Sequence, residues 1–329
     1  METSSVFILF VIFLAFTFDF TNGFHDAGNS IATIVATEVL TPLQAVMWAA
    51  FFNLIAFLFF KLTVASTIGT GLIHTAIVSP YLIFSALTGA IAWNMITWYY
   101  GLPSSSSHAL IGGLAGAALA KGGLHALEFS GFIKVIGAII LSPIIGLVIG
   151  LGLTLLVTKL TKRNSEATNH QWFKRLQLIS SALLSLTHGG NDAQKTMGVI
   201  AVLLYSSSWL GDHFYVPFWV VISCQFVIGL GTLAGGWRIV HTMGKKITHL
   251  NTLRGSCAET AAAMVIFAAT DFGIPVSTTH TVTGAIAGVG ISQSFWGVQW
   301  QMMNKIFLTW VLTIPATAII AAGVMLIRQ

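Results

Sequence analysis

Long apolar runs cover most of the chain, from Ser4 to Leu326, and only short polar segments interrupt them. Most of these runs are long enough to cross a hydrocarbon core of about 30 Å as helices. The first run, Ser4 to Phe18, follows no basic segment and leads into a polar motif instead of a cleavage site, which argues against a signal peptide. We therefore expect an all-α polytopic membrane protein without a sizeable soluble domain.

One short motif interrupts the apolar pattern twice. Gly101-Leu102-Pro103-Ser104-Ser105-Ser106-Ser107-His108 recurs 172 positions later as Gly273-Ile274-Pro275-Val276-Ser277-Thr278-Thr279-His280. Apolar runs flank each copy directly. Proline followed by hydroxyl residues and an apolar run is typical of a helix N-terminus. Non-helical backbone in a membrane is tolerated only where protein or water lines it. We therefore predict two re-entrant helical hairpins with tips at 101–108 and 273–280.

A second motif is also duplicated, in the same order along the chain. Asp26 and Asp192 lie 166 positions apart, and Thr21, Gly23 and Ala27 recur at the same offset as Thr187, Gly189 and Ala193. Two motifs repeated in one order indicate an internal duplication, which is the sequence mark of a transporter repeat. We expect transmembrane repeats over 1–158 and 176–329, joined by a loop over 159–175.

Charge sets the expected topology. Charged residues are 8% of the 329 residues, against about 25% in soluble domains. The formal net charge of +5 does not indicate nucleic-acid binding, because basic residues gather in two loops, at 159–175 and 238–254. The positive-inside rule places both loops in the cytoplasm. The N- and C-termini are then outside, and the two repeats have inverted topology with broken helices. Their hairpins enter from opposite faces and meet near the midplane.

Several charged side chains fall inside the apolar pattern: Asp26, Asp192, Lys195 and Glu259. Each costs about 2.5–3.5 kcal/mol at the centre of a membrane helix, so we expect them to face a polar interior and one another. Asp192 and Lys195 are also spaced as an i, i+3 pair, and a purely structural ion pair holding a broken helix is the alternative interpretation.

The hydroxyl clusters are candidate anion ligands. A helix N-terminus presents free N–H groups and a partial positive charge, and each hairpin adds three hydroxyls, Ser105-Ser106-Ser107 and Ser277-Thr278-Thr279. Capping or packing alone is the structural alternative. His108 and His280 either donate to the anion or brace the hairpins. The glycine pairs Gly112/Gly116 and Gly284/Gly288 predict close helix packing, and their faces make a homodimer plausible. Cys224 and Cys257 are interpreted as buried free thiols.

The duplicated motifs resemble those of the inorganic phosphate transporter (PiT) family, which carries a Gly-Ala-Asn-Asp-Val-Ala-Asn-type signature in each inverted half. The copies here are Gly23-Phe24-His25-Asp26-Ala27-Gly28-Asn29 and Gly189-Gly190-Asn191-Asp192-Ala193-Gln194-Lys195. The resemblance implies a phosphate cradle of Ser105, Ser106, Ser107, Ser277, Thr278 and Thr279. It makes Asp26, Asn29, Asn191 and Asp192 cation or proton ligands. The residues in these two motif copies are most similar to those of the bacterial low-affinity branch of the family, whose members lie in the inner membrane. This resemblance implies proton coupling and transport of phosphate with or without a divalent metal.

Two residues depart from the family pattern, His25 in the first motif and Lys195 in the second. A lysine ammonium has donors but no lone pair for a sodium ion. Lys195 would supply a fixed positive charge, with Asp26 or Asp192 carrying the proton. If coupling is to sodium instead, Asp26 and Asp192 are the metal ligands. His25, His108, His280 and Glu259 are expected to support the site.

The leading hypothesis is a secondary symporter for inorganic phosphate that works by alternating access and needs no cofactor. Sulfate in place of phosphate, and sodium in place of protons, stay open as variants. No Walker-type loop supports ATP drive. An intramembrane hydrolase on Ser107/His108 or on Asp26/Asp192 is disfavoured, because adjacent helical residues do not face each other and an enzyme has no need of a duplicated site. A channel is the remaining class of function. It would be distinguished by its rate of transport, because a carrier saturates at turnover rates far below those of channel conduction.

Overall fold

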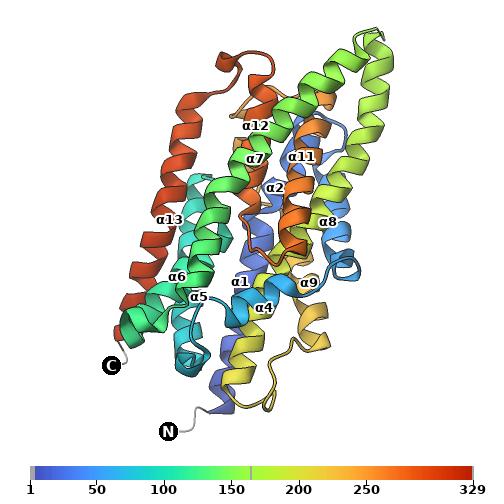
Figure 1. Ribbon diagram of the computed structural model, residues 1–329. Helices are drawn as coiled ribbons and strands as arrows, with labels where there is room; N and C mark the ends of the chain where they lie inside the picture. The colour runs from blue at the N-terminus through green and yellow to red at the C-terminus, as the bar shows by residue number, and fades with distance from the viewer. Residues whose placement is uncertain (1–3, 164, 328–329) are drawn as a thin grey trace.

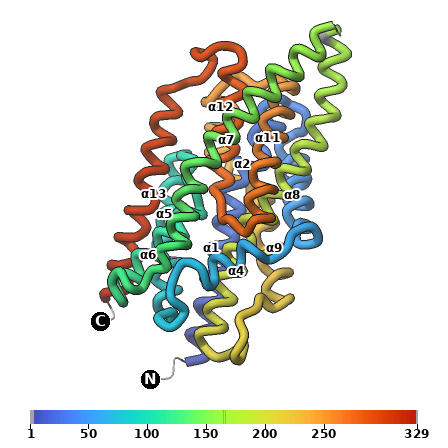
Figure 2. Tube along the Cα trace, viewed as in Figure 1, coloured from blue at the N-terminus to red at the C-terminus, as the bar shows by residue number. Residues whose placement is uncertain are grey.

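The computed structural model describes residues 4–163 and 165–327, and it is all-helical (Figures 1 and 2). Its described α-helices and 3₁₀-helices (η) are α1 (Ser5–His25), α2 (Ala27–Ala36), α3 (Pro42–Ile55), η1 (Ala56–Leu58), α4 (Thr63–Thr70), η2 (Thr75–Ile77), α5 (Pro80–Tyr100), α6 (Ser106–Gly122), η3 (Gly123–Ala126), α7 (Phe129–Thr161), α8 (Glu166–Ser206), α9 (Phe218–Ala234), α10 (Trp237–Lys245), α11 (Thr252–Asp271), α12 (Thr278–Ile291), η4 (Phe295–Gly297) and α13 (Trp300–Leu326).

Helices long and apolar enough to cross a membrane make up the body of the molecule. Among the described residues these are the α1–α2 segment Ser5–Ala36, α5, α7 and α13. Two further bent pairs meet the same criterion when each is taken as one span. The pair Pro42–Leu58 and Thr63–Thr70 bends by 81°, and the pair α9 and α10 bends by 71°. The expectation of a polytopic helical membrane protein is confirmed.

The elements follow the same order twice along the chain. A bent pair, then a hairpin, then a long helix with an internal proline occurs as α3–α4, α5–α6 and α7, and again as α9–α10, α11–α12 and α13. The internal prolines are Pro143 and Pro315. Each hairpin turns at a glycine in the left-handed region, Gly101 (φ 64°) and Gly273 (φ 68°). Glycine has no Cβ to clash there, which explains why both motif copies begin with it.

The hairpins enter the bundle from opposite ends. In Figure 1 the α5–α6 pair rises from the lower end, whereas the α11–α12 pair descends from the upper end. The α7–α8 connection lies at the top of this view, and α1 begins and α13 ends at the bottom. The two tips meet inside the molecule, where the Ser107 hydroxyl donates to the Val276 carbonyl at 3.4 Å.

Glycines let the hairpins pack closely against the long helices. A Cβ on Gly116 of α6 would lie 2.1 Å from the Ala318 carbonyl oxygen of α13, and one on Gly288 of α12 would lie 2.2 Å from the Leu147 oxygen of α7. Contacts that short exclude any side chain. The glycine faces are therefore occupied within the chain, and they offer no free surface for the homodimer that we based on them.

The two aspartate motifs differ in backbone form. The helix is interrupted at Asp26, where α1 ends and α2 begins, whereas α8 runs unbroken through Asp192. The break expected at the second motif is absent. Asp192 and Lys195 pair along α8, with Lys195 Nζ 2.5 Å from Asp192 Oδ1, so the charges are matched without opening the helix.

Candidate functional site

The first half of the site is built around Asp26, at the break between α1 and α2. Its Oδ1 lies 2.7 Å from His25 Nδ1, and its Oδ2 accepts a hydrogen bond from the Ser106 hydroxyl at 3.0 Å. The other His25 nitrogen lies 3.0 Å from Thr97 Oγ1 and 3.2 Å from Ser104 Oγ. The carboxylate, 2% exposed, is thus tied to the first turn of α6 and, through His25, to the end of α5.

The second half is built around Asp192 on α8. Its Oδ1 accepts a charge-assisted hydrogen bond from Lys195, and its Oδ2 accepts one from the Thr278 hydroxyl at 3.1 Å. Lys195, 1% exposed, also donates to the Ser107 hydroxyl and to the Val276 carbonyl, the latter at 2.9 Å. Its three ammonium protons therefore have three acceptors. Such additional hydrogen bonds help to offset the desolvation cost of a buried ion pair.

The same contact is made in each half by residues at equivalent motif positions. Asn29, 166 positions before Lys195, donates to Thr279 at 3.0 Å, and Lys195 donates to Ser107, 172 positions before Thr279. Likewise Ser106 donates to Asp26 and Thr278 donates to Asp192. Each α1–α2 or α8 motif is thereby bonded to both hairpin tips. The structure brings together eight of the predicted site residues: Asp26, Asn29, Asp192, Lys195, Ser106, Ser107, Thr278 and Thr279.

The two aspartates converge on one point together with a histidine. Within the described residues, a carboxylate oxygen of Asp26, one of Asp192 and a ring nitrogen of His188 all lie within 4.8 Å of one another. His188 Nε2 is 3.2 Å from Asp192 Oδ2, and all three side chains are buried. Two carboxylates and an imidazole are a donor set that a divalent cation accepts.

Two of the predicted phosphate ligands act as helix caps. Ser105 Oγ accepts from the His108 amide at 3.2 Å, and Ser277 Oγ accepts from the His280 amide at 3.1 Å. Each hydroxyl satisfies one of the free N–H groups of its helix. The hydroxyl hydrogens stay available, so capping does not remove either residue from the cradle.

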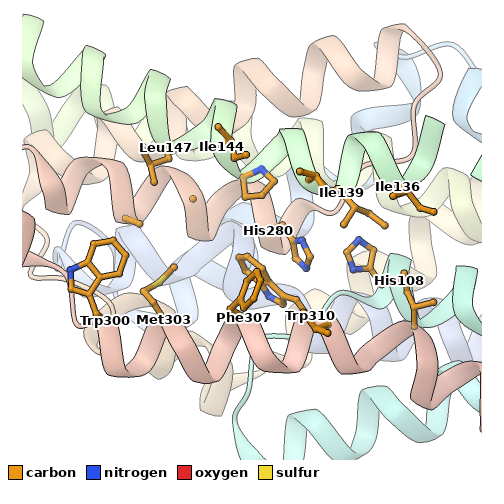
Figure 3. A pocket seen from close by; sticks show the side chains of 16 residues that line it. His108, Ile136, Ile139, Ile144, Leu147, His280, Trp300, Met303, Phe307 and Trp310 are labelled. Carbon is orange, nitrogen blue, oxygen red and sulfur yellow. The ribbon is translucent and has the colours of Figure 1, made fainter. Parts of the chain in front are cut away.

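His108 and His280 line an apolar groove of about 600 Å³ (Figure 3). Their rings pack edge to face with centroids 4.3 Å apart, and His280 stacks on Trp310 at 3.7 Å. Figure 3 shows them between Phe307 and Trp310 on one side and Ile139 and Ile144 on the other. The two imidazoles bridge the first turns of α6 and α12 and make none of the described hydrogen bonds to the tip hydroxyls.

Glu259 and Asn191 lie apart from this cluster. Glu259 accepts hydrogen bonds from Thr33 at 2.6 Å, Gln177 at 3.0 Å and Ser180 at 2.5 Å, which forms a separate buried polar centre. Asn191 donates to Thr270 at 2.9 Å, at the end of α11. Neither contacts Asp26 or Asp192 through a described hydrogen bond.

Sequence reasoning missed three polar groups of the interior. His188 stands one helical turn before Asp192, and that i, i+4 spacing was a usable signal. Asp19 accepts from Thr196 at 2.7 Å and joins α1 to α8. Thr97, which holds His25 together with Ser104, carried no signal because its hydroxyl is of a kind common in membrane helices.

The chain is similar to known proteins over nearly its whole length. The model of the phosphate transporter family matches residues 22–321. A protein of Rhizobium meliloti (strain 1021), named "Probable low-affinity inorganic phosphate transporter", is 59% identical over 98% of this chain and 97% of its own. One of the same name from Bacillus subtilis (strain 168) is 43% identical with the same coverage.

A solved structure, named "The sodium-dependent phosphate transporter", superposes with a TM-score of 0.88 over 98% of this chain and 99% of that one. Its sequence identity is 24%, so this likeness concerns the fold. The family match and the close relatives agree with the duplicated motifs and the buried polar centre they form. The chain belongs to the phosphate transporter family, and it is a membrane transporter and not an enzyme.

Proposed function

We propose that the protein imports inorganic phosphate together with protons, by alternating access through the Asp26–Asp192 centre. The observation that carries the proposal is Lys195, whose ammonium takes the place of a neutral asparagine and contacts both Asp192 and a hairpin hydroxyl. A fixed buried cation at this position replaces a mobile one. The coupling charge must then move on a carboxylate.

Phosphate would bind at the meeting point of the two tips. The first turns of α6 and α12 direct N–H groups and the hydroxyls of Ser106, Ser107, Thr278 and Thr279 into the same centre. Helix N-termini stabilise an anion, and hydroxyl donors suit its oxygens. Phosphate would replace Ser107 or Asp192 as a partner of Lys195. A protonated phosphate oxygen could donate to a carboxylate, which sulfate cannot do at neutral pH.

Asp26 is our proposed proton carrier. Asp192 already has a full cationic partner in Lys195, whereas Asp26 faces His25 at 2.7 Å and the Ser106 hydroxyl. Protonation of Asp26 would change the charge beside the tip of α5–α6 and weaken its acceptor role toward Ser106. A tip released in this way gives a physical link between proton binding and hairpin movement.

The proposed units of movement are two inverted repeats, over 1–158 and 176–329. The recurring order of elements, the opposite entry of the hairpins and the paired contacts support this division. The basic segments lie together, since one pocket is lined by residues of both 167–173 and 251–253. Positive charge at that end supports placing it in the cytoplasm, with the termini outside.

A cation-coupled variant has its own supporting observation. Asp26, His188 and Asp192 could hold a divalent metal carried with phosphate, because their ligand atoms lie within 4.8 Å of one another and His188 Nε2 is already 3.2 Å from Asp192 Oδ2. The protein with the similar fold is itself named as sodium-dependent, which keeps sodium as a second candidate cation. In both variants the cation would compete with Lys195 for Asp192.

The test is uptake of labelled phosphate into proteoliposomes under an imposed pH gradient or an imposed sodium gradient, with and without magnesium. The proposal expects accumulation with the pH gradient alone. Accumulation that requires sodium would support the sodium variant, and a requirement for magnesium would support metal-phosphate transport. Uptake of sulfate without uptake of phosphate would overturn the assignment of phosphate as the substrate.

A further inference from the structure

A basic cleft of about 460 Å³ lies where α10 meets the tip of the α5–α6 hairpin. Arg238, His241 and Lys246 line it on one side and Tyr99, Tyr100 and Gly101 on the other. None of its described lining residues is acidic. The positive-inside rule accounts for an excess of basic residues at this end of the protein, but it does not require three of them to line one cleft.

Hydrogen bonds fasten α10 to the hairpin tip at this cleft. The Arg238 guanidinium donates to the Tyr99 carbonyl and lies 5.0 Å from the Tyr99 ring centroid and 5.3 Å from that of Trp98. The Thr242 hydroxyl donates to the Gly101 carbonyl at 2.9 Å. A ligand in the cleft would therefore touch the helix and the hairpin at once.

The equivalent place at the other hairpin lacks this charge. There α4 holds the tip of α11–α12, with Thr67 donating to the Gly273 carbonyl at 2.7 Å and Thr63 donating to the Thr270 carbonyl at 2.9 Å. The clamp is thus common to both halves, whereas the arginine occurs at one. The charge is a property of this cleft and is not required to hold a hairpin.

We propose that the α10 cleft is a second site for a phosphate group, separate from the Asp26–Asp192 centre. Arg238, His241 and Lys246 supply donors and charge for phosphate oxygens. The cleft is larger than one phosphate ion. Its aromatic rim, with Tyr99 61%, Tyr100 69% and Trp237 42% exposed, is typical of a membrane–water interface. Both free phosphate and the headgroup of an anionic phospholipid carry the required chemistry.

The experiment measures phosphate groups bound per chain. Labelled inorganic phosphate is titrated against the purified protein in phosphatidylcholine nanodiscs. A parallel set contains phosphatidylglycerol, and retained lipid is counted by native mass spectrometry. The variant His241→Ala/Lys246→Ala removes cleft charge without touching the Arg238 clamp. Lys245→Ala removes a neighbouring charge that does not line the cleft and is the matched control.

The proposal expects one phosphate group more on the wild type and on Lys245→Ala than on the double variant, or binding weaker by about tenfold or more in the double variant. A difference seen with inorganic phosphate identifies a free-phosphate site, and a difference seen only in retained phosphatidylglycerol identifies a headgroup site. Phosphate binding at the Asp26–Asp192 centre shows that the double variant is folded. Equal occupancy of all three proteins in both sets would overturn the proposal.

Discussion

The two halves of the centre make matching contacts with different chemistry. In one half Asn29, a neutral amide, donates to Thr279, and in the other Lys195, an ammonium, donates to Ser107. Asp26 has a histidine and a hydroxyl as partners, whereas Asp192 has a full ion pair. A duplicated architecture has therefore acquired one fixed charge. The two halves therefore need not contribute equally to transport, and under the proposed function one half neutralises charge while the other exchanges a proton.

The largest effect should come from removing that charge. Lys195→Ala leaves Asp192 buried and without its cationic partner, a change that costs about 3–5 kcal/mol. Asn29→Ala removes only neutral hydrogen bonds, with a cost of about 1–3 kcal/mol. Chemical denaturation and phosphate uptake of the two purified variants should rank them in that order. Equal losses of stability would mean that the Lys195 ion pair contributes no more than the neutral hydrogen bonds of Asn29, and would contradict the inferred difference between the two halves.

Neutralising each aspartate should separate their roles. Asp26→Asn should abolish accumulation of phosphate driven by a pH gradient. It should leave exchange of phosphate across the membrane of phosphate-loaded liposomes, because the substrate cradle is intact. Asp192→Asn should lose both activities, since it leaves Lys195 as an unpaired buried cation. For each variant, counterflow of labelled phosphate is compared with phosphate uptake driven by the pH gradient. Normal pH-driven uptake by Asp26→Asn would remove Asp26 as the proton carrier.

The paired hydroxyls offer a finer comparison. Ser107 is bonded to an ammonium and Thr279 to an amide, and hydrogen bonds to charged groups contribute about 1.5–3 kcal/mol against about 0.5–1.5 for neutral ones. Ser107→Ala should therefore lower the free energy of unfolding by about 1.5–3 kcal/mol, and Thr279→Val by about 0.5–1.5 kcal/mol. Chemical denaturation of the two purified variants decides this, and a larger loss of stability at Thr279 would reverse the inferred asymmetry.

The smallest effect on transport is expected at Glu259. Its three hydrogen-bond donors lie outside the Asp26–Asp192 centre, so Glu259→Gln should keep the KM within about twofold, or about 0.4 kcal/mol. The same change should lower stability by about 1–3 kcal/mol, because donors lose a charged acceptor. A large change in KM with unchanged stability would place Glu259 in the transport mechanism.

The hairpins could be predicted from the sequence because their signals are local. The glycine, proline, hydroxyl and apolar positions that form each tip stand within a few residues of one another. The pairing of Asn29 with Thr279 joins positions 250 residues apart, and no local pattern reports such a contact. His188 escaped notice, although it is one turn from Asp192. The structural interpretation of Asp192 and Lys195 placed their ion pair in a broken helix, whereas α8 runs unbroken through both residues.

Under the proposed function, the Lys195 ammonium provides a fixed charge where a mobile cation would otherwise bind, and parallel measurements of proton flux and phosphate flux test this role. Proton entry and phosphate entry are followed together in proteoliposomes containing the wild type or Lys195→Asn, with a pH gradient or a sodium gradient imposed. We expect proton entry with phosphate in the wild type and no effect of sodium. In Lys195→Asn we expect loss of proton-driven uptake. Sodium-driven uptake by the wild type, or unchanged proton coupling in Lys195→Asn, would contradict it.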